Sequence, residues 1–180
     1  NLWFKILLPA TWETLYMSLV ATLIALGLGI FPAILLTLSD PKGLRPNPKL
    51  YQGLDLLINT LRSFPFLILM IVLFPLTKFL LGKTIGTTAA IVPLSIGAAP
   101  FVARILEGAL KEVDKGVIEA AKSFGAGDYQ IIFKIMFSEA LPSIVSGLTL
   151  TLITVIGFSA MAGAIGGGGL GDVAIKYGYY

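Results

Sequence analysis

The sequence contains apolar runs long enough to cross a lipid bilayer, and these runs limit the possible folds most strongly. The longest lies between Leu15 and Leu38 and holds no charged residue, and a membrane helix needs about 20 such residues. Only 13% of all residues are charged, whereas a soluble domain has about 25%. A soluble helical core would lack polar residues for its surface. The sequence therefore predicts an all-α polytopic membrane protein.

Turn residues divide the apolar part of the chain into separate spans. We expect residues 1–180 to form a single transmembrane domain with spans at about 11–38, 64–81, 85–106 and 140–164. The second span contains Pro75, and the third contains Pro93 and Pro100, so both are expected to kink or unwind locally. Gly27 and Gly29 in the first span are predicted to allow close contact with another helix.

The distribution of basic residues predicts the orientation in the membrane. If the polar segments 40–62 and 104–139 lie on one side, that side carries nine Lys and Arg residues and the other side carries four. By the positive-inside rule, the two polar segments are then cytoplasmic. Four spans place both ends of the sequence outside. Because the basic residues lie at span ends, they indicate contact with membrane lipid rather than with nucleic acid.

The residue types argue against catalysis by this chain. Cysteine and histidine are both absent, so thiolate chemistry, Cys/His metal sites and the commonest general base are excluded. All Asp and Glu residues fall outside the apolar centres, whereas proton- or sodium-coupled carriers usually need an acidic group there. The glycines at 166–169 are not followed by the Lys-Ser/Thr of a phosphate-binding loop. We therefore predict no enzyme activity and no cofactor, with a secondary transporter or channel as an alternative function.

The longest polar segment, about 107–139, is expected to form a cytoplasmic loop with a short helix. Glu119–Lys122 favours helix formation, and Gly125 and Gly127 are expected to end that helix in a sharp turn. A second helical stretch, 129–136, would lead into the last span. The small side chains of the first helix would allow another protein to approach closely. On physical grounds alone, a docking surface and a plain connector both remain open.

The same segment resembles a known motif. Glu119-Ala120-Ala121, followed by Gly125 and then Ile135, is similar to the EAA motif of type I ABC importer permeases. In that family the loop carries a coupling helix that sits in a cleft of a cytoplasmic ATPase. The resemblance therefore assigns ATPase coupling to Glu119, Ala120, Ala121 and Gly125. One departure is that Phe137-Ser138 stands where the family has Leu-Pro, and Leu141-Pro142 follows four residues later.

Other stretches resemble the methionine-importer subfamily of these permeases. They are Arg62–Phe66, Ala89–Leu94, Ala99–Arg104, Gly157–Gly163 and the tail from Gly166 to Tyr179. The resemblance implies a multi-pass subunit of the bacterial inner membrane that pairs with a second copy and with a cytoplasmic ABC ATPase dimer. An extracytoplasmic binding protein would deliver L- or D-methionine, or a close analogue, for transport by alternating access. The subfamily has five spans, so a fifth helix is expected after Tyr180. Import of another small amino acid is the alternative.

Methionine combines charged groups with an apolar thioether chain, and it suits a cavity of small polar groups with Met or Phe side chains. We accordingly predict that Ser63, Phe66, Ser159 and Met161 line the pathway or its gate. A role in packing alone is an equally good interpretation of each of these residues.

Overall fold

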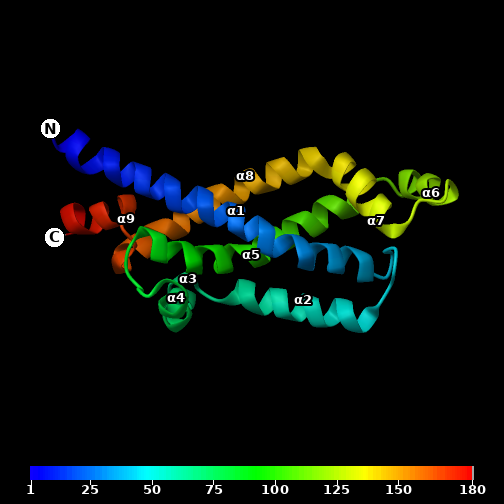
Figure 1. Ribbon diagram of the computed structural model, residues 1–180, viewed down its shortest axis with the longest axis horizontal. Coiled ribbons are helices and arrows are strands. Elements are labelled where there is room, and N and C mark those ends of the chain that lie inside the picture. Colours follow the sequence, from blue (N-terminus) through cyan, green and yellow to red (C-terminus); the bar gives the residue numbers. More distant parts are fainter. Residues whose placement is uncertain (180) are drawn as a thin grey trace.

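The computed structural model describes residues 1–179, and within them it contains helices and no strands (Figure 1). The α-helices are α1 (Leu8–Ser39), α2 (Pro48–Ser63), α3 (Phe66–Val72), α4 (Phe74–Leu81), α5 (Thr87–Lys111), α6 (Lys115–Ser123), α7 (Asp128–Gln130), α8 (Phe137–Ala162) and α9 (Gly169–Ala174). Wider π-helical turns extend several of them: η1 (Trp3–Leu7), η2 (Ile131–Met136), η3 (Gly163–Gly167) and η4 (Ile175–Tyr179).

Among the described residues, three helical stretches are long and apolar enough to cross a membrane. They are Trp3–Ser39, Thr87–Lys111 and Asp128–Gly167. A fourth crossing is possible if α2 and α3, which meet at 101°, form one broken span. The predicted class, an all-α polytopic membrane protein, is confirmed. The expected fifth span would lie outside the described residues.

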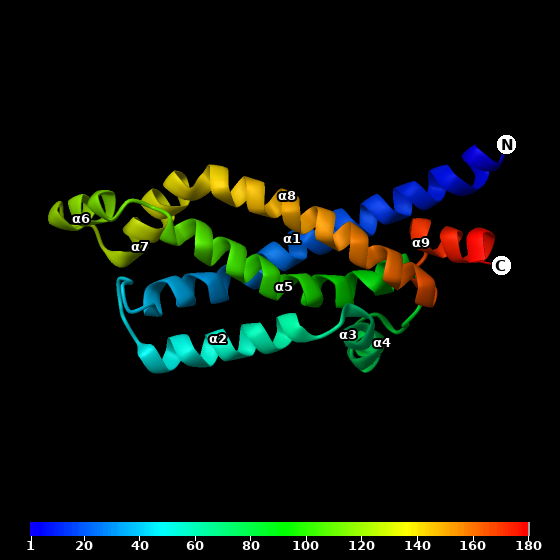
Figure 2. The ribbon, with the colours of Figure 1, turned by 180° about the vertical axis from the view of Figure 1, so that it is seen from behind.

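The two polar connections lie at one end of the bundle. α6 projects beyond the long helices at that end, and the start of α1 lies with α9 at the opposite end (Figures 1 and 2). This arrangement fits the prediction that residues near the two ends of the chain share one side of the membrane. The helix that we expected from about residue 140 begins earlier, at Asp128, because Ile131, Ile132 and Met136 are buried in the core.

The segment predicted as a second span, 64–81, is not one continuous helix. Phe64 is extended at φ −67° and ψ 126°, as expected for a residue directly before proline. α3 then ends at Val72, and Pro75 occupies the first turn of α4. Since proline lacks a backbone N–H donor and fits best in a first helical turn, Pro65 and Pro75 account for the two breaks.

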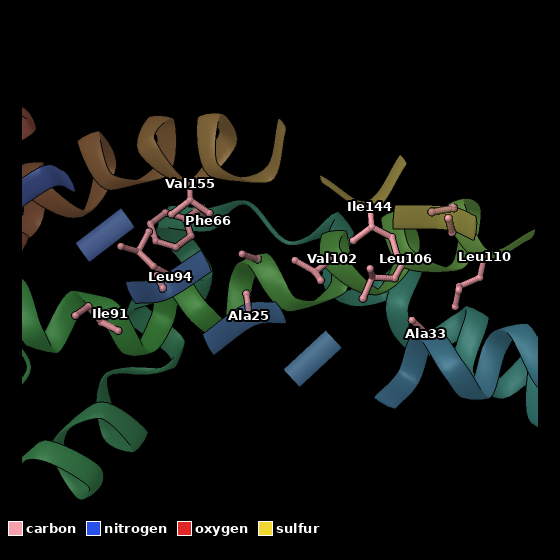
Figure 3. Packing of buried hydrophobic residues seen from close by; sticks show 14 of the residues in the cluster. Ala25, Ala33, Phe66, Ile91, Leu94, Val102, Leu106, Leu110, Ile144 and Val155 are labelled. Atoms are coloured by element: carbon pink, nitrogen blue, oxygen red, sulfur yellow. The ribbon is translucent and has the colours of Figure 1, made fainter. Parts of the chain in front are cut away.

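The core lies where α5 packs between α1 and α8 (Figure 3). α5 buries a stripe of apolar residues spaced by four, namely Ala90, Leu94, Ala98, Val102, Leu106 and Leu110. α1 presents a matching stripe of smaller residues, which includes Ala21, Ala25, Gly29 and Ala33. Residues spaced by four share one face of a helix. The small stripe therefore lets the two backbones approach closely. α5 itself continues through Pro93 and Pro100 as one helix.

Candidate functional site

α6 begins and ends with local hydrogen bonds that define its length. At its start, the Asp114 carboxylate accepts a bond of 2.9 Å from the Gly116 N–H. At its end, Gly125 adopts φ +85°, a conformation that costs a residue with a Cβ more than it costs glycine. The N–H of Gly125 donates to Lys122 O (3.0 Å) and the N–H of Ala126 donates to Ala121 O (3.1 Å). This pair of bonds is the Schellman arrangement, so Gly125 ends the helix as predicted.

The two sides of α6 differ in what they contact. Ile118 and Ala121 are partly buried and pack against the core of the bundle. Val117, Ala120 and Phe124 share an adjacent side of the helix and are exposed, with Phe124 at 91%. We call these three residues the α6 outer face. Together they form a small exposed apolar patch, and contiguous patches of this kind can bind a partner.

The four predicted coupling residues therefore lie in or directly after α6, but they do not share one face. Ala120 belongs to the outer face, Ala121 packs inward, and Gly125 shapes the turn. Glu119 lies on the flank and lines a cavity. Sequence reasoning missed Phe124, although its spacing of four from Ala120 and seven from Val117 predicts that the three share one face.

The cavity beside Glu119 has a volume of about 580 Å³ and lies between α6, the loop after α1, the end of α5 and η2. Its charged lining residues are Asp40, Lys42, Lys111, Lys115, Glu119 and Lys122. Asp40 accepts bonds from Lys111 Nζ (2.7 Å) and from the Lys42 N–H (2.9 Å). Burial alone would raise the pKa of Asp40, but these bonds together hold that pKa below its ordinary value.

Three contacts fix α6 and its neighbouring turn to the bundle. Arg45, in the loop after α1, forms an ion pair with Asp128 at the start of α7. Ser143 in α8 donates a bond of 2.9 Å to Glu112, directly after α5. Val113, in the connection to α6, is buried. Both ends of the α6 segment are therefore joined to the bundle.

The predicted pathway residues fall into two groups. Ser63 and Met161 are exposed, Met161 at 46%. Phe66 and Ser159 are buried, and the Ser159 hydroxyl donates to Ile156 O within its own helix (2.6 Å). Ser159 and Met161 are two positions apart, so they point to nearly opposite sides of α8. The four residues do not line one surface of this chain.

Phe66 belongs to an aromatic cluster that joins three helices. Its ring stacks on Phe158 of α8 with the centroids 4.9 Å apart, and Phe101 of α5 lies 6.1 Å from Phe158. The guanidinium of Arg62 lies 5.5 Å from the centroid of Phe101. This cluster places α3 against α5 and α8, directly before Ser159. Among residues 1–179, no group of three or more acidic side chains is arranged to hold a metal ion.

The chain is thus a helical bundle with candidate membrane spans and a surface helix, α6, that projects at one end. Residues 28–179 match the family described as binding-protein-dependent transport system inner membrane component. The chain belongs to this family of inner-membrane transport permeases.

Named relatives cover nearly the whole chain. The chain is 51% identical to the probable D-methionine transport system permease protein MetI of Vibrio cholerae, over 99% of this chain and 81% of the relative. It is 50% identical to the methionine import system permease protein MetP of Bacillus subtilis, over 94% of this chain and 77% of the relative.

Solved structures give the same result for the fold. The chain superposes with a TM-score of 0.95 on a chain of the inward-facing MetNI methionine ABC transporter, at 44% identity over 98% of this chain and 82% of that one. A more distant amino acid ABC transporter, at 22% identity and a TM-score of 0.74, shares the fold.

Proposed function

We propose that this chain is the permease subunit of an ATP-driven methionine importer of the bacterial inner membrane. The support for the substrate is the identity of about half of the residues with relatives named as methionine permeases, across almost the whole chain. The chain would import L-methionine, D-methionine or both, together with close analogues. Import of another small amino acid by the same mechanism is the alternative.

In this proposal two copies of the chain enclose the pathway, and each copy binds one subunit of a cytoplasmic ATPase dimer. The permease itself does not hydrolyse ATP. An extracytoplasmic binding protein delivers methionine when the pathway opens outward. Closure of the ATPase dimer on ATP moves the two α6 helices and switches the spans from inward-open to outward-open, so transport proceeds by alternating access.

The observation that carries the coupling role is the α6 outer face. Its apolar residues, with Phe124 exposed at 91%, suit insertion into a cleft of another protein. The inward side of the same helix packs on the core, so movement of the cleft would reach the spans. Glu119, Ala120, Ala121 and Gly125 serve this role by different means: Ala120 in contact, Ala121 and Gly125 in holding the helix, and Glu119 on its flank.

For the pathway, we assign different roles to the four candidates. Ser63 and Met161 are exposed, and they would face the pathway between the two copies. Phe66 and Ser159 are buried, and they would shape the pathway wall from behind. Met161 is the better gate candidate, because its side chain is large and flexible among small neighbours.

The test is uptake by proteoliposomes that hold the permease with its own ATPase and binding protein. Labelled L- and D-methionine should enter only when ATP is present on the ATPase side. Uptake driven by a proton or sodium gradient without ATP would instead support a secondary transporter. If another amino acid entered with a higher kcat/KM than either methionine isomer, the substrate assignment would be wrong.

A further inference from the structure

A cluster of charged residues lies near the end of α5, apart from the α6 outer face and the pathway candidates. At its centre is Glu107, whose side chain is only 7% exposed. One carboxylate oxygen of Glu107 accepts a bond from Arg104 Nη1 (2.9 Å) and the other accepts one from Lys111 Nζ (3.0 Å). Glu107 therefore holds two cations at once, one on each side of it along α5.

Each of these two cations also reaches another part of the chain. Arg104 Nη2 bonds to the Asp55 carboxylate and to Asn59 Oδ1 (3.0 Å), both in α2. Lys111 Nζ bonds to Asp40 in the loop after α1 (2.7 Å) and to the Tyr51 hydroxyl in α2 (3.2 Å). The same ammonium group lies 4.9 Å from the centre of the Tyr51 ring. Two cations thus join α5 to both α2 and the loop.

The α2 residues in these contacts, Tyr51, Asp55 and Asn59, are spaced by four and so share one face of the helix. The apolar contact between α2 and its neighbours is small: Ile58 packs with Ala103 and Leu36, and Tyr51 and Leu54 cover the edge. The charge network therefore adds directional contacts to a small apolar interface between α2 and its neighbours.

The network also lies between two parts of the proposed transport mechanism. α5 is followed after three residues by α6, so a displaced α6 would move the end of α5 first. α2 ends at Ser63, and α3 begins at Phe66, whose ring stacks on Phe158 of α8. We propose that Glu107 is a positioning residue that makes α2 and the loop after α1 move with α5 as a single body when the ATPase moves α6. This inference rests on the proposed function of α6.

Replacement of Glu107 by glutamine is the most direct perturbation. Glutamine keeps the shape but has one acceptor oxygen and an amide that repels a cationic donor, so either Arg104 or Lys111 loses its bond to position 107. That cation keeps its bonds to α2 and the loop but is no longer tied to position 107, so the link from α5 to α2 weakens. Asp55→Asn is a second variant, which weakens the α2 contact and leaves both bonds of Glu107 intact.

Spin labels can measure this coupling, because the chain has no cysteine. Gln52→Cys in α2 and Gly108→Cys in α5 place the labels at exposed positions, and a Cβ at Gly108 meets no atom of the described chain within 4 Å. Labelled chains diluted with unlabelled ones give the distance within one copy. In the complete transporter, we expect one narrow distance distribution that is the same without nucleotide and with a non-hydrolysable ATP analogue.

In Glu107→Gln, we expect that distribution to broaden and to differ between the two nucleotide states. Methionine uptake per ATP hydrolysed should fall about tenfold, which corresponds to the loss of one hydrogen bond to a charged group. Asp55→Asn should also broaden the distance distribution and lower the uptake per ATP, but by less than Glu107→Gln. Glu139→Gln is the matched control, because Glu139 is an exposed carboxylate of α8 outside the network, and it should leave both unchanged.

Two results would overturn the inference: a distance that already changes with nucleotide in the unaltered transporter, or a Glu107→Gln transporter with the unaltered distance and uptake ratio. If the Glu107→Gln protein does not reach the membrane, an Asp55→Asn transporter with the unaltered distance and uptake ratio would overturn the inference. Absence of ATP-dependent uptake in the unaltered complex would instead count against the proposed function.

Discussion

Two glycines in α1 allow a matched test of how closely α1 and α5 pack. A Cβ added at Gly29 would lie 2.9 Å from Ala99 O, 3.0 Å from Ala103 N and 3.0 Å from Val102 Cγ1. A Cβ added at Gly27, half a turn away, would meet no atom of the described chain within 4 Å. Gly29→Ala should therefore destabilise the protein relative to Gly27→Ala.

The size of the difference follows from the contacts. Two of the three atoms near Gly29 are backbone atoms, so they cannot rotate away, and α1 must shift by a few tenths of an ångström from α5. Such overpacking costs about 1–3 kcal/mol. Alanine also favours the helical state over glycine by about 1 kcal/mol, but this gain is common to both variants and cancels in the comparison. We expect Gly29→Ala to be about 1–3 kcal/mol less stable than Gly27→Ala.

The measurement is the folded fraction that remains in detergent after heating, followed by size-exclusion chromatography. For a chain of this size, a difference of 1–3 kcal/mol corresponds to a midpoint about 2–12 °C lower for Gly29→Ala. Both variants must be heated at the same rate, since unfolding of such proteins is often irreversible. Equal midpoints, or a higher one for Gly29→Ala, would refute the predicted close packing.

Three further predictions concern α6 and the loop after α1. Phe124→Ser should lower ATPase binding and methionine uptake at least tenfold without changing the thermal midpoint, because the Phe124 ring is exposed in the permease. The control is Tyr129→Ser, at a side chain that is 80% exposed and lies outside α6. Unchanged ATPase binding by Phe124→Ser would count against the docking role. Gly125→Ala should cost about 1 kcal/mol more than Gly127→Ala in thermal stability, because Gly125 has φ +85° and Gly127 has φ −78°. Asp40→Asn should destabilise the protein at neutral pH. Folding lowers the pKa of Asp40, so its ionised carboxylate stabilises the fold at pH values above the unfolded pKa of 3.8, and this stabilisation is lost as the pH falls through the folded pKa. The thermal midpoints of the two proteins should therefore converge between pH 7 and pH 3.

The fold class could be predicted from the sequence because a bilayer sets a length that the apolar runs must meet. The helix ends near Gly125 could also be predicted, because the turn chemistry is local. The division of segment 64–81 into α3 and α4 could not be predicted. Pro75 was visible, but whether a proline kinks a membrane helix or begins a new one depends on the neighbouring helices that satisfy the freed carbonyl groups.

Tertiary contacts account for what the sequence could not supply. Gly27 and Gly29 are alike in the sequence, yet only Gly29 faces α5. Likewise, Phe66 and Met161 were both candidates for the pathway, but Phe66 is buried against Phe158 and Met161 is exposed. Such differences depend on how each helix is rotated in the bundle, and a rotation of one residue, about 100°, changes which side chains are covered.

In the proposed mechanism, the segment after α5 has two tasks. α6 would present its outer face to the ATPase, while its position in the permease depends on Ile118, Ala121 and the turn at Gly125. α5 would carry the movement of α6 into the bundle and must not bend at its end. Buried Glu107 has a cation bonded to each carboxylate oxygen. Because these bonds are directional, they would hold α2 and α5 in one position, whereas apolar packing alone would let the two helices slide past each other. We therefore expect variants in the α6 outer face to abolish ATPase binding, and variants of Glu107 to preserve binding but separate ATP hydrolysis from uptake.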